Sequence, residues 1–163
     1  MKNRKRGFSL VELLIVLAVI AALIATITPV ALNAIRKAQA TKVAQNMKTL
    51  AAAIENAAYV NGYDAANGRI YKDASKGTLT ISDLGRDVDD TKYSIKYSFT
   101  GTQFKVAVIS NEIVDLPTAQ DVVKGLANYS DTVLNSFLGS TLVGTLGTAT
   151  TPQIVYTFTF DLY

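Results

Sequence analysis

The chain has 163 residues, a formal net charge of +3 and neither cysteine nor histidine. Without cysteine no disulfide can hold the fold, and without histidine the His-dependent nucleophile systems and nearly all zinc sites are excluded. Four basic residues lie within the first six positions, and the rest of the chain carries 12 basic and 13 acidic residues, which gives no support to a nucleic-acid-binding surface.

The N-terminal basic block leads directly into a long apolar run. No charged residue occurs from Leu13 to Ile35, a span longer than the ~20 residues that a helix needs to cross a bilayer. The positive-inside rule places the N-terminus in the cytoplasm and the chain after Arg36 outside. Glu12 lies near the start of the run, where a carboxylate is costly in lipid, so it is a functional candidate. The plain alternative is an interfacial side chain that snorkels toward water.

Residues 5–16, at the junction, read Lys-Arg-Gly-Phe-Ser-Leu-Val-Glu-Leu-Leu-Ile-Val. This segment resembles the class III signal of type IV pilins and of the pseudopilins of type II secretion. The resemblance implies cleavage after Gly7 by a prepilin peptidase and methylation of the new N-terminal residue, Phe8. It also implies subunit assembly through Phe8, Glu12 and Pro29, the last two matching a glutamate and a proline of the family signal. An ordinary secretory signal is instead cleaved after its apolar run.

A helical pattern continues beyond the apolar run. Between Arg36 and Tyr59 apolar residues recur at intervals of four, three, four and three, at Val43, Met47, Leu50, Ile54 and Ala57. The pattern predicts one helix from Ser9 to Val60, about 78 Å long at 1.5 Å per residue, that ends at Asn61-Gly62. Pro29 is expected to kink or locally open this helix, unless it is simply a tolerated membrane-helix proline.

The first part of the remaining chain is predicted to be a connecting region followed by a hairpin. Residues 62–92 contain a turn signal at Asn67-Gly68 and a short alternating piece at 78–82. Residues 93–100 alternate between aromatic or aliphatic and polar side chains, which predicts a strand with one buried face. Gly101 allows a tight turn, and residues 104–109 form the returning strand.

The C-terminal part is less evenly patterned. Pro117 is expected to open a short helix through Leu126, with Thr118 and Asp121 spaced as a capping box. Residues 130–152 are rich in Ser, Thr and Gly, and no element is assigned to them. Alternation near the C-terminus predicts the strongest strand of the chain, because Ile154, Tyr156, Phe158, Phe160 and Leu162 alternate with Val155, Thr157, Thr159 and Asp161. Because the chain lacks the disulfide of many relatives, packing and strand pairing must hold this segment.

Two surface motifs were weighed as sites. Asp83, Asp87, Asp89 and Asp90 form an acidic loop that could hold calcium through oxygen ligands, although a solvated turn explains it better because the loop lacks the glycine and terminal glutamate of a calcium-binding hand. Asn128-Tyr129-Ser130 fits a glycosylation acceptor, but such a short motif is commonly unmodified. No cofactor and no set of catalytic residues is predicted.

We therefore expect an α+β fold in four segments: a cleaved leader (1–7), a hydrophobic transmembrane or filament-core helix half (8–35), an amphipathic helix half (36–61) and a globular α+β head (62–163). Outside the bilayer, the apolar half needs other copies around it, and a contact that does not close on itself gives a filament. In that dry bundle Glu12 needs a cation, and the family resemblance implies the Phe8 amine of an adjacent subunit.

The resulting function is a structural subunit of a homo-oligomeric type IV pilus, with adhesion, motility or DNA uptake as outputs. Its partners are the prepilin peptidase, the assembly machinery and, before assembly, the inner membrane. The alternatives are a pseudopilin of a secretion system, whose filament is a short periplasmic piston, and an enzyme or binding domain on a signal anchor. No convergent catalytic set favours the last of these.

Overall fold

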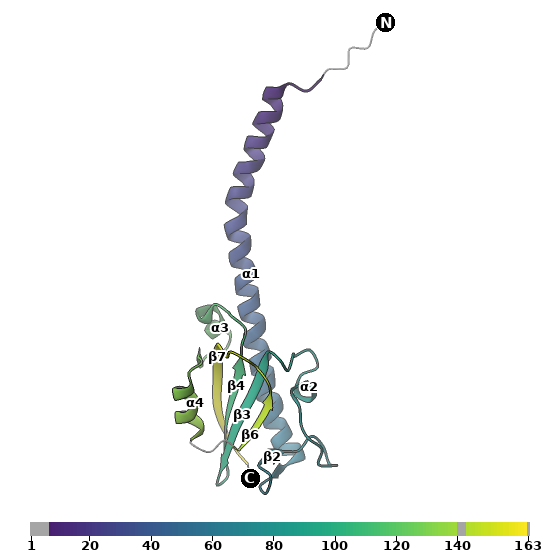
Figure 1. The fold of residues 1–163 in the computed structure, drawn as a ribbon, viewed down its shortest axis with the longest axis vertical. Coiled ribbons are helices and arrows are strands. Elements are labelled where there is room, and N and C mark those ends of the chain that lie inside the picture. Colours follow the sequence, from purple (N-terminus) through teal and green to yellow (C-terminus); the bar gives the residue numbers. More distant parts are fainter. Residues whose placement is uncertain (1–6, 140–142, 163) are drawn as a thin grey trace. The chain divides into compact units, whose positions relative to one another are not determined.

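The computed structural model describes residues 7–139 and 143–162 of the chain (Figure 1). The chain divides into two compact units, Met1–Arg36 and Lys37–Tyr163, each described by itself below. Of the predicted leader 1–7, only Gly7 is among the described residues. The observed elements are those of an α+β protein, because a long N-terminal helix is followed by a small antiparallel sheet.

Helix α1 runs from Leu10 to Asn61 and contributes to both units. Its end agrees with the predicted stop, since Gly62 has a φ of 83°, which favours glycine. The helix continues through Pro29 as one uninterrupted element. A proline removes a single N–H donor, and the hydrogen bonds on both sides of it hold the remaining turns of this 52-residue helix together.

The region expected to be a connection contains three short elements. β1 (Tyr63–Asp64) and β2 (Arg69–Ile70) pair antiparallel around the predicted turn at Asn67-Gly68. The alternating piece at 78–82 does not form a strand but leads into a one-turn helix, α2 (Ile81–Leu84). Thr80 and Asp83 form a capping box at its start, and this local hydrogen bonding favours the helical turn over an extended strand.

A five-stranded antiparallel sheet forms the centre of the second unit. Its strands lie in the order β5-β7-β4-β3-β6, which places β7 between β5 and β4. The strand bounds are β3 Tyr93–Thr100, β4 Gln103–Ser110, β5 Leu126–Asn128, β6 Gly144–Gly147 and β7 Ile154–Asp161. The predicted hairpin is confirmed, with Tyr93 opposite Ser110 and a turn at Gly101, where φ is 65°.

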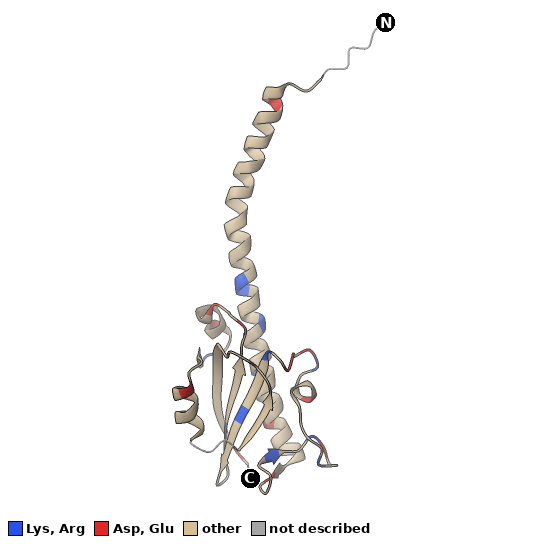
Figure 2. Cartoon of the chain, viewed as in Figure 1, with Lys and Arg blue, Asp and Glu red and all other residues tan. Residues whose placement is uncertain are grey.

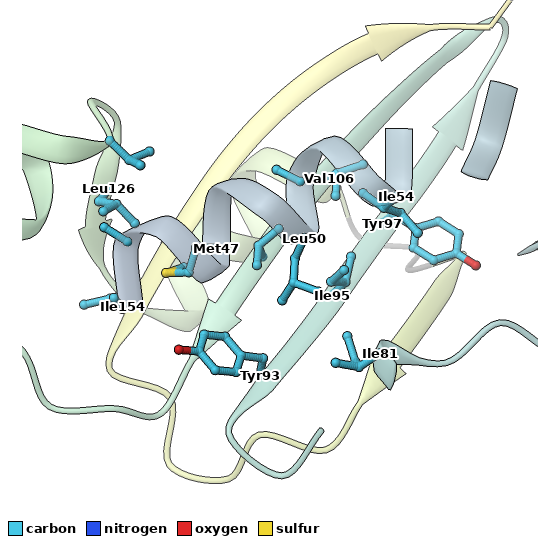
Figure 3. Close-up of a cluster of buried hydrophobic side chains, with 14 of the residues drawn as sticks. Met47, Leu50, Ile54, Ile81, Tyr93, Ile95, Tyr97, Val106, Leu126 and Ile154 are labelled. Atoms are coloured by element: carbon cyan, nitrogen blue, oxygen red, sulfur yellow. The ribbon is translucent and has the colours of Figure 1, made fainter. Parts of the chain in front are cut away.

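The amphipathic half of α1 packs on one face of this sheet (Figure 3). The predicted apolar stripe of the helix is confirmed, since all five of its residues are buried: Val43, Met47, Leu50, Ile54 and Ala57. They meet side chains from the sheet and its flanking loops, among them Ile81, Tyr93, Ile95, Tyr97, Val106, Leu126 and Ile154. Burying a large aliphatic side chain stabilises a fold by about 1.5–3 kcal/mol, so this face anchors the helix to the sheet.

The opposite face of the sheet is also covered, which the sequence did not predict. Helix α4 (Asp131–Leu138) places Leu134 and Leu138 in a second buried cluster with Ala107, Ile109 and Val155. The C-terminal strand is buried on both faces over part of its length, since Val155 is buried as well as Ile154. Helix α4 and strand β6 both lie in the region 130–152, to which no element was assigned.

Helix α3 (Leu116–Val122) differs from its prediction at both ends. The N-cap is Asp115, whose carboxylate accepts a hydrogen bond from the Thr118 N–H, so the expected capping box of Thr118 and Asp121 is wrong. An Asp at the N-cap position bonds to the third helical N–H just as a Thr would. At the other end Leu126 begins β5 instead of continuing the helix.

Candidate functional site

The predicted cleavage site lies immediately before α1. Residues 7–9 are not helical, and the first helical bond joins the Leu13 N–H to the Ser9 carbonyl oxygen at 3.2 Å. The Phe8 side chain is 81% exposed. The bond between Gly7 and Phe8 is therefore in irregular, open backbone, which suits a peptidase because an extended substrate is easier to bind than a helical one.

Glu12 takes part in the start of the helix. Its Oε2 atom accepts a hydrogen bond from the Ser9 backbone N–H at 2.8 Å, which is half of a capping box. A carboxylate in the first turn also interacts favourably with the positive end of the helix dipole. In a single chain, Glu12 is thus satisfied by its own backbone, and its predicted pairing with Phe8 of another copy remains a proposal.

Ser9 was not singled out from the sequence, although a signal for it was there. A serine or threonine followed three positions later by an acidic residue, just before an apolar run, predicts a capping box. Ser9 and Glu12 fit this pattern and open α1 accordingly. The two residues fix where the helix begins relative to the predicted cleavage site.

The apolar half of α1 has no covering surface within its unit. Every large hydrophobic side chain from Leu10 to Ile35 is exposed, by 46% to 77%. Helix α1 is long and apolar enough to cross a membrane, and the most hydrophobic window in it has a mean hydropathy of 2.9 with none of its residues buried. An exposed apolar surface of this length is not stable in water and needs lipid or other helices around it.

In the acidic loop, as elsewhere among the described residues, no three His, Cys, Asp or Glu side chains gather in a metal-binding arrangement. Asp83 accepts a hydrogen bond from Lys72 at 2.8 Å, and this bond is the largest cause of its lowered pKa. Asp89 accepts hydrogen bonds from the hydroxyl and N–H groups of Thr91, which lower its pKa. Of the weak metal candidates, Asp87, Asp89 and Asp90, Asp89 is the one whose carboxylate has a hydrogen-bond partner among the described residues.

The glycosylation motif lies partly in an edge strand. Asn128 is exposed at the end of β5, opposite Ile154, while the Ser130 hydroxyl oxygen accepts a hydrogen bond from the Val133 N–H as the N-cap of α4. Tyr129 lies between these two residues. Burial and the neighbouring Asp131 carboxylate, to which the Tyr129 hydroxyl donates a hydrogen bond at 2.7 Å, raise the pKa of Tyr129 to about 12. Modification of Asn128 remains a hypothesis.

Comparison with known families gives one match. Residues 2–28 match the prokaryotic N-terminal methylation motif. The chain carries the class III signal of type IV pilins and pseudopilins. Gly7, Phe8 and Glu12 fall inside this match, and Pro29 lies immediately after it. No curated protein and no solved structure matches the chain.

The chain therefore carries a motif found in pilin-like proteins and pseudopilins, and it has a pilin-like arrangement of a long helix and a small antiparallel sheet. Its prepilin-type motif implies processing by a prepilin peptidase and assembly into pilus-like filaments, and its apolar helix fits a membrane-anchored precursor. Pilin-type proteins are structural and are not known as enzymes.

Proposed function

We propose that the mature chain is the structural subunit of a type IV pilus, assembled through the apolar half of α1. The observation that carries this proposal is the uninterrupted exposed surface from Leu10 to Ile35 on a helix that also bears the methylation motif. In the precursor this surface lies in lipid with the N-terminus in the cytoplasm. In the filament the same surface packs against copies of itself, which replaces lipid by protein without exposing it to water.

Each segment has a separate role in this proposal. Segment 1–7 is a leader removed by the prepilin peptidase, and Phe8 becomes the methylated N-terminus. Segment 8–35 crosses the membrane and then forms the filament core, while segment 36–61 joins it to the head, 62–163. The described core supports the division between segments 8–35 and 36–61, because buried side chains of α1 begin at Ala40.

Three residues are proposed to act in assembly. Glu12 of an incoming subunit pairs with the Phe8 amine of its neighbour, because a charge in a dry helix bundle is strongly unfavourable without a partner. Pairing at one fixed depth also sets the axial register between subunits. Pro29 is proposed to adapt α1 to its neighbours, since the missing N–H weakens the helix at that turn.

A pseudopilin of a type II secretion system uses the same subunit chemistry in a shorter periplasmic filament. The two functions are separated by shearing cells that express the native protein and examining the sheared fraction by electron microscopy and intact-mass analysis. The pilus predicts long surface fibres made of a chain that begins at N-methylated Phe8. The absence of such fibres, with the processed chain retained in the cell envelope, favours the pseudopilin, and a chain that still begins at Met1 contradicts both functions.

A further inference from the structure

One face of α1 in the second unit packs against none of the residues that the structure describes. It lies away from the buried stripe and lines a shallow hollow of about 670 Å³, all of whose residues come from α1: Gln45, Lys48, Thr49, Ala52, Ala53 and Asn56. Helical spacing adds Lys42, which precedes Gln45 by three positions and Thr49 by seven. Short side chains in the middle of this face leave room for an approaching segment.

This face, called here the basic face, carries two lysines, Lys42 and Lys48. Lys42 and Lys48 are both exposed, and neither forms an ion pair within residues 7–139 and 143–162. Figure 2 shows basic residues spaced along α1, whereas most acidic residues lie in the loops and short helices of the head. Since exposed cations attract acidic surfaces, the basic face is suited to an acidic partner.

The head contains an acidic loop with unused charge. Asp87 and Asp90 are exposed, and neither makes an ion pair or a side-chain hydrogen bond with the residues that the structure describes. Three other acidic residues of the head form ion pairs, namely Asp64 with Arg69, Asp83 with Lys72 and Glu112 with Lys92. The loop also lies beside its own α1, where an added Cβ on Gly85 would approach Leu50 to 3.6 Å, yet no ion pair joins the loop to Lys48.

We propose that the basic face of one subunit, through Lys42 and Lys48, binds the acidic loop of a second copy, through Asp87 and Asp90. This inference rests on the proposed filament function. Each copy offers one basic face and one acidic loop, so the contact is heterologous and repeats along an open array. The basic face also continues the helix whose apolar half assembles with other copies. Membrane phosphates could also bind the two lysines, but they would repel the acidic loop and leave Asp87 and Asp90 without a cationic partner.

Exposed ion pairs are individually weak, so this contact sets partner choice and register rather than supplying most of the assembly energy. Full-length Lys42→Glu/Lys48→Glu, expressed in a host without the wild-type copy, is expected to form at least tenfold fewer filaments with unchanged cleavage and membrane insertion. Adding Asp87→Lys/Asp90→Lys restores the opposite charges and should recover most of the filaments. The control is Lys124→Glu, which reverses one exposed lysine outside the basic face and is matched to the single variant Lys48→Glu. Lys124→Glu should assemble normally.

The outcomes separate the contact from its alternatives. Normal filaments in Lys42→Glu/Lys48→Glu, or a defect that the aspartate reversals do not repair, overturns the contact. A loss of membrane-bound precursor in the lysine variant indicates that lipid phosphates are the partner, and also overturns it. If wild-type chains themselves form no filament, the proposed function fails, and the inference that rests on it fails with it.

Cross-linking provides a second test, because the chain contains no cysteine. Thr49→Cys and Arg86→Cys are introduced into separate chains with different epitope tags, which prevents a bond within one chain. Both positions are exposed, and both changes keep the four charged residues of the contact. Sheared filaments from cells that express both chains should yield a disulfide dimer carrying both tags. No mixed dimer, or an equal yield when Lys124→Cys replaces Arg86→Cys, overturns the contact.

Discussion

Glu12 changes partners in the proposed assembly. In a single chain its carboxylate accepts the Ser9 N–H and thereby helps to start α1 two residues after Phe8. In the proposed filament the Phe8 amine of a neighbour would provide a full positive charge, which is a stronger partner than a neutral N–H. The same side chain can therefore be satisfied before and after assembly, and only the assembled state links two copies.

Replacing Glu12 by alanine should separate membrane insertion from assembly. Insertion should be unchanged, because an apolar residue is cheaper in lipid than a carboxylate. Surface filaments should fail to form or become very rare, because the Phe8 amine of each neighbour loses its buried partner. Immunoblotting of membranes and microscopy of the cell surface measure the two effects in a host without the wild-type copy. Normal numbers of filaments with normal cleavage would remove Glu12 from assembly and leave the interfacial explanation.

The identity of Gly144 is set by a close contact with a neighbouring side chain. A Cβ at this position would lie 2.0 Å from the Tyr97 ring, whose hydroxyl oxygen accepts the Ile70 N–H at 3.2 Å. Gly144→Ala must therefore displace a buried ring, and overpacking of this kind costs about 1–3 kcal/mol. Urea unfolding of the domain 37–163 should show a lower midpoint for this variant than for Thr145→Ala, an exposed neighbour. Equal midpoints would mean that the ring moves freely.

At the scale of elements, the strands that alternate aromatic or aliphatic with polar residues were predictable. The hairpin 93–110 and the C-terminal strand were predicted because apolar and polar side chains alternate along them with the period of two that a strand requires. Strand β6 was missed because Gly144 and Gly147 bound only Thr145 and Leu146, so no alternation can be read from it. It forms because β3 offers it a partner and a close approach to Tyr97, which are tertiary effects.

Helix α4 was missed for a different reason. Its region is rich in Ser and Thr, which favour caps and turns over helix interiors. The signal that could have found it is local, since Ser130 caps a segment in which Leu134 and Leu138 are spaced by four. Within the candidate site, Gly7, Phe8 and Glu12 were identified from the motif alone, whereas the bond from Ser9 to Glu12 depends on backbone geometry that spacing only suggests.

The position of β7 predicts that the head cannot fold without it. The strand pairs with β4 along its whole length and with β5 at Ile154, Val155 and Tyr156, and it contributes to the clusters on both faces of the sheet. Deleting residues 154–163 should abolish cooperative unfolding. Circular dichroism during heating measures the effect, with Thr159→Ala as a control at an exposed position of the same strand. An unchanged melting curve for the deletion would contradict the observed sheet order.

At the scale of the molecule, the two units differ in how they can be stabilised. The second unit, Lys37–Tyr163, contains all the buried hydrophobic residues of the described chain, beginning at Ala40. The first unit, through Arg36, has none and bears the exposed apolar surface. Solubility and folding should therefore belong to the second unit, and membrane insertion and the apolar assembly surface to the first.

Expression of residues 37–163 alone tests this division. We expect a soluble monomer with a cooperative thermal transition, because the apolar stripe of α1 is covered within the same unit. Size-exclusion chromatography with light scattering and circular dichroism measure the two properties, and the full-length chain, which should require detergent, is the control. An insoluble or unfolded truncation would show that α1 needs neighbours along its whole length.

The same truncated domain should lose stability in alkali. Burial is the largest cause that raises the pKa of Tyr93 and Tyr97 above the usual 10.0. The unfolded chain then releases these protons at a lower pH than the folded one, so stability is fully present below about pH 10 and falls as the pH rises through the raised pKa values. The melting temperature should accordingly be nearly level between about pH 7 and 9 and fall above about 10.

Tyr93→Phe removes one of the two ionisations and should make the alkaline fall less steep. Because Tyr93 also accepts a 3.2 Å hydrogen bond from Asn46, the variant is compared by the slope of its pH profile and not by its absolute stability. A slope equal to that of the unmodified domain would show that Tyr93 does not contribute to the alkaline transition.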